Sequence, residues 1–234
     1  AEANDEMMEI SQRVSPKLSQ TSNNIFLNEK LLARVKSIYD KKEQLNLSTE
    51  DAKLLEDLYE SFKANGATLN KDDKEKYRKL SMDLSMLTLQ FDQNALKDKN
   101  RFELLITDEN ELSGLPESAR DAAAMLAKSK DKNGWLFNLS APSYIPFMRY
   151  SDKRDLREKM YREYMSVGNK GDEFDNKDII KKIVNIRLEI AQLMGFKNYA
   201  EYALEHTMAK NSANVYKLLN QLLEAYKPIA INEY

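Results

Sequence analysis

The chain has 234 residues, and its 36 lysines and arginines nearly balance 38 aspartates and glutamates, which gives a formal net charge of −2. Without a global excess of positive charge, neither nucleic acid nor an anionic membrane is an expected partner. The absence of cysteine excludes disulfides and cysteine-based metal sites. Turn-forming residues are scarce, with 6 glycines and 5 prolines, so we expect a mainly α, multi-helix fold.

The N-terminal residues predict two helices. Residues 2 to about 15 suit one helix that Pro16 bends or ends, because proline lacks a backbone donor and clashes with the preceding turn. A second, amphipathic helix is predicted from Asn23 or Asn24, both good N-cap residues, to Tyr39. Its apolar residues recur every three or four positions, as on one face of a helix.

Two further helices are predicted between residues 48 and 100. Ser48 is the expected N-cap of the first, and Gly66 supplies the left-handed residue that ends it. The side chains expected on its buried side are Leu54, Leu55, Leu58, Tyr59 and Phe62. A long helix then starts at Asn70, and its apolar residues from Tyr77 to Phe91 suit packing on an antiparallel neighbour. We therefore expect a helical hairpin here.

The middle of the chain predicts a small two-stranded β inset, at about 101–107 and 135–139. Both segments are rich in residues that favour strands. Between them, Pro116 opens an alanine-rich helix that extends to about Ser129. Because an isolated strand pair is marginally stable, this inset must pack on the surrounding helices.

The C-terminal third predicts helices again, at 144–150, 151–167, 175–195 and 198–206, with a last one from Ser212. We accordingly expect three subregions: helical hairpins in 1–100, the β/α inset in 101–140 and further helices in 141–234. The chain starts without methionine, and its final apolar pattern stops without a glycine cap or polar tail. We interpret the chain as a piece of a longer protein, truncated at both ends.

Candidate chemistry within the chain is sparse. His206 is the single histidine, so a zinc helix of the form H-E-x-x-H, which needs two imidazoles, is excluded, and we expect His206 at the surface or near a helix end. The acidic loop 172–178 lacks the residue order of a calcium loop, which favours helix capping instead. Segment 142–150 holds three aromatic residues, two prolines and an arginine, and we interpret it as a buried corner rather than a ligand surface. We predict no catalytic, cofactor-binding or metal-binding residue in this chain.

A set of short motifs, in order along the chain, resembles the thimet-oligopeptidase family of zinc metallopeptidases. These motifs are Gly114-Leu115-Pro116, Trp135-Leu136-Phe137-Asn138-Leu139, Pro142-Ser143-Tyr144-x-Pro146-Phe147-Met148-x-Tyr150, Arg154-x-Leu156-Arg157-Glu158-x-Met160-Tyr161, Ile186-Arg187-x-Glu189-x-Ala191-x-Leu193-Met194-Gly195-Phe196-x-Asn198-Tyr199-Ala200 and Met208-Ala209-Lys210. Within that family the chain is most similar to the bacterial peptidyl-dipeptidases (dipeptidyl carboxypeptidases). The resemblance is specific over 114–234, whereas 1–110 match as a helical pattern.

The resemblance implies a helical enzyme whose two halves flank a deep channel that admits short peptides. Its catalytic half binds zinc through H-E-x-x-H and a later glutamate, and no residue of that set can be placed on this chain. Residues 1–234 are therefore expected to be a non-catalytic N-terminal channel wall of a peptidase that releases C-terminal dipeptides. The expected partners are short peptide substrates and the missing C-terminal catalytic half, with zinc bound in the parent enzyme and not here.

One alternative from another class remains open. A stand-alone helical scaffold or adaptor without enzymatic activity would also lack catalytic motifs, and the 10 methionines would suit an adaptable binding surface. The expected compartment is the cytoplasm, with the periplasm as the alternative. The sequence does not separate a dipeptide-releasing exopeptidase from a broader oligopeptidase.

Overall fold

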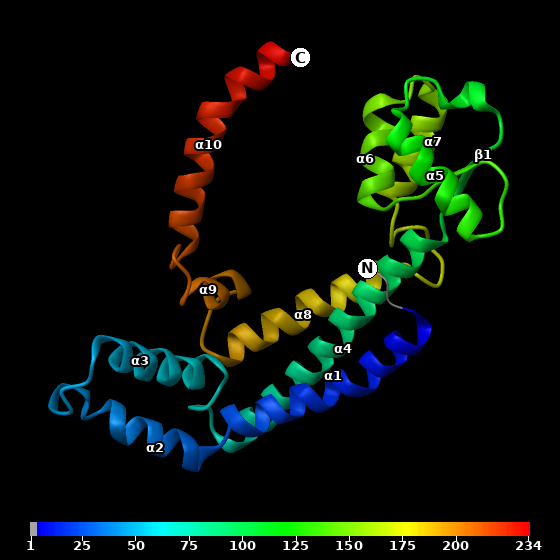
Figure 1. The fold of residues 1–234 in the computed structure, drawn as a ribbon. Coiled ribbons are helices and arrows are strands. Elements are labelled where there is room, and N and C mark those ends of the chain that lie inside the picture. Colours follow the sequence, from blue (N-terminus) through cyan, green and yellow to red (C-terminus); the bar gives the residue numbers. More distant parts are fainter. Residues whose placement is uncertain (1–3) are drawn as a thin grey trace. The chain divides into compact units, whose positions relative to one another are not determined.

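The computed structural model describes residues 4–234, so positions 2 and 3 of the first predicted helix lie outside the described residues. The described chain is mainly helical, with a single pair of short antiparallel strands among these residues (Figure 1). The helices are α1 (Asp5–Phe26), α2 (Glu29–Tyr39), α3 (Thr49–Ala64), α4 (Lys71–Arg101), α5 (Glu117–Ser129), α6 (Ala141–Tyr150), α7 (Arg154–Met165), α8 (Lys177–Leu193), α9 (Tyr199–Leu204) and α10 (Ser212–Glu233). The mainly α fold with a small two-stranded inset is thereby confirmed.

The chain divides into two compact units. Of the described residues, the first unit contains 4–8 together with Thr88–Lys181, and the second contains Glu9–Leu87 together with Lys182–Tyr234. None of the helices in residues 4–234 is both long enough and apolar enough to cross a bilayer.

The first unit is built around the β inset. Strands β1 (Leu104–Ile106) and β2 (Trp135–Phe137) pair antiparallel, with Leu105 opposite Leu136. Helix α5 packs against β2. Gly134, with φ of +114°, precedes β2 at a point where a Cβ would overlap the carbonyl oxygen of Ile106. Both strands are shorter than predicted: β1 covers 104–106, with residue 101 still in α4, and β2 ends at Phe137.

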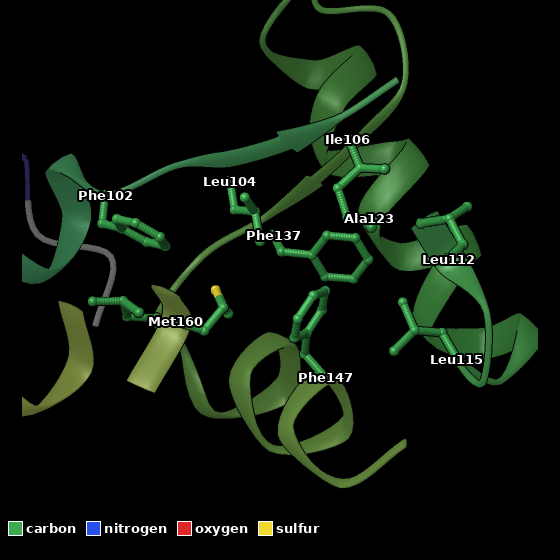
Figure 2. Packing of buried hydrophobic residues seen from close by; sticks show 10 residues of the cluster. Phe102, Leu104, Ile106, Leu112, Leu115, Ala123, Phe137, Phe147 and Met160 are labelled. Carbon is green, nitrogen blue, oxygen red and sulfur yellow. The ribbon is translucent and has the colours of Figure 1, made fainter. Parts of the chain in front are cut away.

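The core of the first unit lies between this sheet and the helices α5, α6 and α7. It contains Phe102, Leu104, Ile106, Leu112, Leu115, Ala123, Phe137, Leu139, Phe147 and Met160 (Figure 2). The rings of Phe137 and Phe147 meet edge to face, with centroids 4.7 Å apart. Each large apolar side chain buried here contributes about 1.5–3 kcal/mol. The segment 142–150 thus forms a helix that contributes Phe147 to the core, while Ile145 and Tyr150 are exposed.

The second unit has two apolar clusters. In one, helices α2 and α3 pack together around Val35, Leu55 and Phe62, and the rings of Tyr39 and Tyr59 stack 4.1 Å apart. The other joins α4 to α8 through the buried side chains Leu27, Tyr77, Leu80 and Ile190.

Three helix ends follow the caps predicted from the sequence. Ser48 Oγ accepts from the N–H of Asp51 at 3.1 Å, and Asn70 Oδ1 accepts from the N–H of Asp73 at 2.9 Å. At the end of α8, Gly195 has φ of +87°, and the N–H of Phe196 donates to the carbonyl of Ala191 at 2.8 Å. This last bond satisfies a carbonyl that would otherwise lack a partner in the helix.

The first predicted helix boundary is wrong. Helix α1 continues through Pro16 to Phe26, so Asn23 lies inside it and Asn28 caps α2 by accepting from the N–H of Leu31 at 3.0 Å. The physical reason is tertiary. Asn23 is buried and donates to the Ser81 hydroxyl on α4 at 2.9 Å. This tertiary contact stabilises the helical backbone around Asn23.

The predicted buried face of α3 is partly wrong. Leu55 and Phe62 are buried, but Leu54 is 65% exposed and Leu58 is also exposed. The five predicted side chains spread over a wider part of the surface of α3 than the packing of α2 buries. The helix that packs against α3 is α2, which precedes it in the chain.

Helix α10 contains no buried residue. Its exposed apolar side chains are Tyr216, Leu218, Leu219, Leu222, Leu223, Tyr226, Ile229 and Ile231. Burial against other helices normally supplies most of the stability of a helix in water, and within residues 4–234 the apolar side chains of α10 lack such burial.

Candidate functional site

His206 lies in the turn that follows α9, in the second unit. Its side chain is 43% exposed, and its Nε2 lies 3.3 Å from a carboxylate oxygen of Glu205. A pocket of about 600 Å³ contains both residues, lined on its other side by α3 residues that include Glu60 and Ser61. Within residues 4–234 no hydrogen bond joins the Ser61 hydroxyl to the imidazole, so these side chains do not form a nucleophile–base pair.

Two carboxylates of this pocket, those of Asp57 and Glu60, are paired with lysines. Lys53 Nζ donates to Asp57 at 2.7 Å, and Lys63 Nζ donates to Glu60 at 2.9 Å. These hydrogen bonds raise the pKa of both lysines above the ordinary value. Mixed charges paired in this way are typical of a solvated face and supply no group poised for proton transfer.

The acidic loop 172–178 caps and closes a turn. Asp175 accepts from the N–H of Lys177 at 2.9 Å and from the N–H of Gly171 at 2.6 Å, and both bonds lower its pKa. The Asp172 carboxylate pairs with the Arg101 guanidinium, which lowers the pKa of Asp172. These oxygens are therefore already occupied by donors within the protein.

Sequence reasoning missed a buried charge at the end of α4. Asp98 has 0% of its surface exposed, and its carboxylate accepts from the N–H of Gly168 at 2.7 Å. Arg101 lies 2.7 Å from Asp98, and Lys170 lies 3.1 Å away. Burial alone would lower the pKa of Lys170, but its bonds to Glu163 and Asp98 raise it. The cluster fixes the loop after α7 to α4. The sequence does not single out Asp98 as buried, because the neighbouring residues on the helix are also charged.

A metal site does not emerge from these side chains. Among residues 4–234, no group of three or more histidine, aspartate or glutamate side chains is arranged to hold a metal ion. Zinc bound through H-E-x-x-H, which needs two histidines, therefore does not fit the residues present.

Comparison with known proteins extends the resemblance to the whole chain. Residues 147–234 match the family profile described as peptidase family M3. Oligopeptidase A of Salmonella typhimurium is 34% identical over 227 residues, which cover 95% of this chain and 33% of that protein. Dipeptidyl carboxypeptidase of Escherichia coli is 31% identical over 234 residues, 100% of this chain and 34% of that protein.

A plant protein also matches. The probable cytosolic oligopeptidase A of Arabidopsis thaliana is 38% identical over 181 residues, 74% of this chain and 26% of that protein. The chain thus spans about a third of the length of the bacterial relatives, and the alignments with them include its N-terminal half. Identity is higher to these oligopeptidases A than to the dipeptidyl carboxypeptidase. The chain belongs to peptidase family M3.

Proposed function

We propose that this chain is the non-catalytic N-terminal part of a zinc metallopeptidase that hydrolyses short peptides, and that it forms one wall of the substrate channel. The observation that carries the proposal is the single histidine in a chain that aligns along its whole length with peptidases about three times as long. The zinc ligands and the general base would then lie in the remaining C-terminal part of the polypeptide. Release of C-terminal dipeptides is the activity we assign within this class, in line with the dipeptidyl carboxypeptidase relative.

The exposed face of α10 supports a missing partner. Leu218, Leu219 and Leu222 are exposed, as are the apolar side chains beyond them. We assign this face to contact with the catalytic part of the same polypeptide. The proposed compartment is the cytoplasm, consistent with the name of the Arabidopsis relative.

A substitution at His206 tests the proposal in the longer polypeptide that contains this chain. In His206→Gln, the zinc content and the rate of peptide hydrolysis should both stay within about twofold of those of the unsubstituted polypeptide, because a side chain outside the zinc site affects neither. Ser61→Ala is the matched control in the same pocket. Loss of zinc from the His206 variant alone would contradict the proposal.

The stand-alone scaffold is the second candidate. The exposed apolar face of α10 favours this candidate because the face could bind another protein. The two candidates differ in how the isolated chain behaves. A severed part should self-associate through α10, and Leu222→Lys should reduce this association in sedimentation velocity, since a buried lysine is costly. A monomeric chain at concentrations of tens of micromolar would favour the scaffold.

A further inference from the structure

A second pocket, of about 410 Å³, lies in the first unit between α6 and α7, which pack side by side (Figure 1). Its lining residues are Met148 on α6 and Arg154, Arg157, Glu158, Tyr161 and Arg162 on α7. The α7 positions are separated by three, four, seven and eight residues from the first, so they share one face of the helix. Stacking of Tyr144 on Tyr164, with ring centroids 4.2 Å apart, holds α6 against α7 beside this face.

The pocket carries more positive charge than its own acid can neutralise. Three guanidinium groups face one carboxylate, that of Glu158, which is already bound by Arg162 at 2.7 Å. Arg157 donates to the main-chain carbonyl of Ser151, a bond that holds the guanidinium without neutralising it. Across residues 4–234, the Arg154 side chain has no hydrogen-bond or ion-pair partner. Two positive charges therefore remain available to a ligand.

The end of α7 strengthens this positive potential. Arg154 is the first residue of the helix, and the capping position, Lys153, supplies no side-chain acceptor to the free N–H groups. The positive end of the helix dipole thus lies next to the unpaired Arg154 guanidinium. The local excess contrasts with the net charge of −2 of the whole chain.

The pocket has room for an organic anion. Its volume is more than ten times the roughly 30 Å³ that one water molecule occupies in the liquid, so a single inorganic oxyanion would leave it mostly empty. Met148 and the half-exposed ring of Tyr161 add apolar surface beside the guanidinium groups. Arginine side chains bind carboxylates through two parallel hydrogen bonds.

We propose that the pocket between α6 and α7 binds a carboxylate group of a short peptide, with Arg154 as the main contact and Arg157 as the supporting charge. The choice of a peptide among organic anions rests on the proposed function. The carboxylate can come from an acidic side chain or from a free C-terminus, and the two sources are separable by chemistry.

Isothermal titration calorimetry at low ionic strength tests the proposal on the protein. Three versions of one hexapeptide serve as probes: one with a central glutamate and a free C-terminus, the same peptide with an amidated C-terminus, and an amidated version with glutamine in place of glutamate. Inorganic phosphate is the fourth probe. Arg154→Gln should weaken binding of the carboxylate peptides by about tenfold or more, because it removes a charge-assisted pair.

Lys159→Gln is the matched control, because it removes one positive charge from the same helix at a position outside the pocket. The control should change affinity by less than about twofold. Loss of binding on amidation assigns the C-terminal carboxylate, and loss on replacement of glutamate assigns the side chain.

Three results would overturn the proposal: equal binding of the peptide without carboxylates, equal weakening by Lys159→Gln, or phosphate binding as tight as peptide binding. Peptide hydrolysis by the longer polypeptide without Arg154-dependent binding would refute this pocket alone. Arg154-dependent binding without any hydrolysis would refute the proposed function alone.

Discussion

The buried carboxylate of Asp98 should matter more to stability than an exposed carboxylate with as many partners. In Asp98→Asn the amide oxygen still accepts from the N–H of Gly168, but the attraction to two cations is lost. Each charged hydrogen bond is worth about 1.5–3 kcal/mol. Arg101 and Lys170 are partly exposed and keep second carboxylate partners, so we reduce the sum to a cost of about 2 kcal/mol.

Urea unfolding followed by tryptophan fluorescence measures this cost. Trp135 is the single tryptophan and lies in β2 of the first unit, which also contains Asp98. With an m-value of about 1.5 kcal/mol per M, the midpoint should fall by about 1.3 M. The matched control is Glu103→Gln, since Glu103 pairs with both Lys130 and Lys132 but is partly exposed. Its cost should stay below about 1 kcal/mol. An equal or larger effect of Glu103→Gln would refute the argument from burial.

Three further predictions concern the first unit. Phe147→Ala should cost about 3–5 kcal/mol and Phe147→Leu less than about 2 kcal/mol in the same unfolding assay, because the ring is fully buried against Phe137; similar costs would contradict the packing. Gly114→Ala should cost at least about 2 kcal/mol more than Gly171→Ala. Both have positive φ, but a Cβ at Gly114 overlaps a carbonyl oxygen, whereas nothing lies within 4 Å at Gly171. Lys130 and Lys132 lower the pKa of Glu103, so its stabilisation is complete above its ordinary pKa of 4.5 and is lost as the pH falls through the lower folded value. Between about pH 5 and pH 3, the unfolding free energy should fall less steeply in Glu103→Gln, and parallel curves would contradict this linkage.

Local signals predicted much of the fold. Ser48, Asn70 and Gly195 act where the sequence places them, because caps satisfy backbone groups within a few residues of themselves. The two strands were also predictable, since their composition differs from that of the surrounding helices.

Tertiary contacts account for the failures. Pro16 is tolerated inside α1 while Asn23 bonds to Ser81, 58 residues away, and no local pattern records that partner. Leu54 is exposed although its spacing suits the apolar face of α3, because packing against α2 does not bury that whole face.

The charged sites were hidden for a similar reason. Asp98 and Arg154 both lie in helices rich in charge. Asp98 is buried and paired, whereas Arg154 is exposed and its side chain has no partner among residues 4–234. Spacing places residues on a face of a helix but does not say which ion pairs form there. The absence of catalytic residues from this chain remains a prediction.

Peptide hydrolysis by the 234-residue chain itself tests the central claim most directly. The chain should be stripped of metal with a chelator, supplied again with zinc, and assayed with short peptides beside the longer polypeptide treated in the same way. We predict zinc-dependent hydrolysis by the longer polypeptide and none by the chain, because its single histidine cannot complete the zinc site. Zinc-dependent hydrolysis by the chain alone would contradict the account.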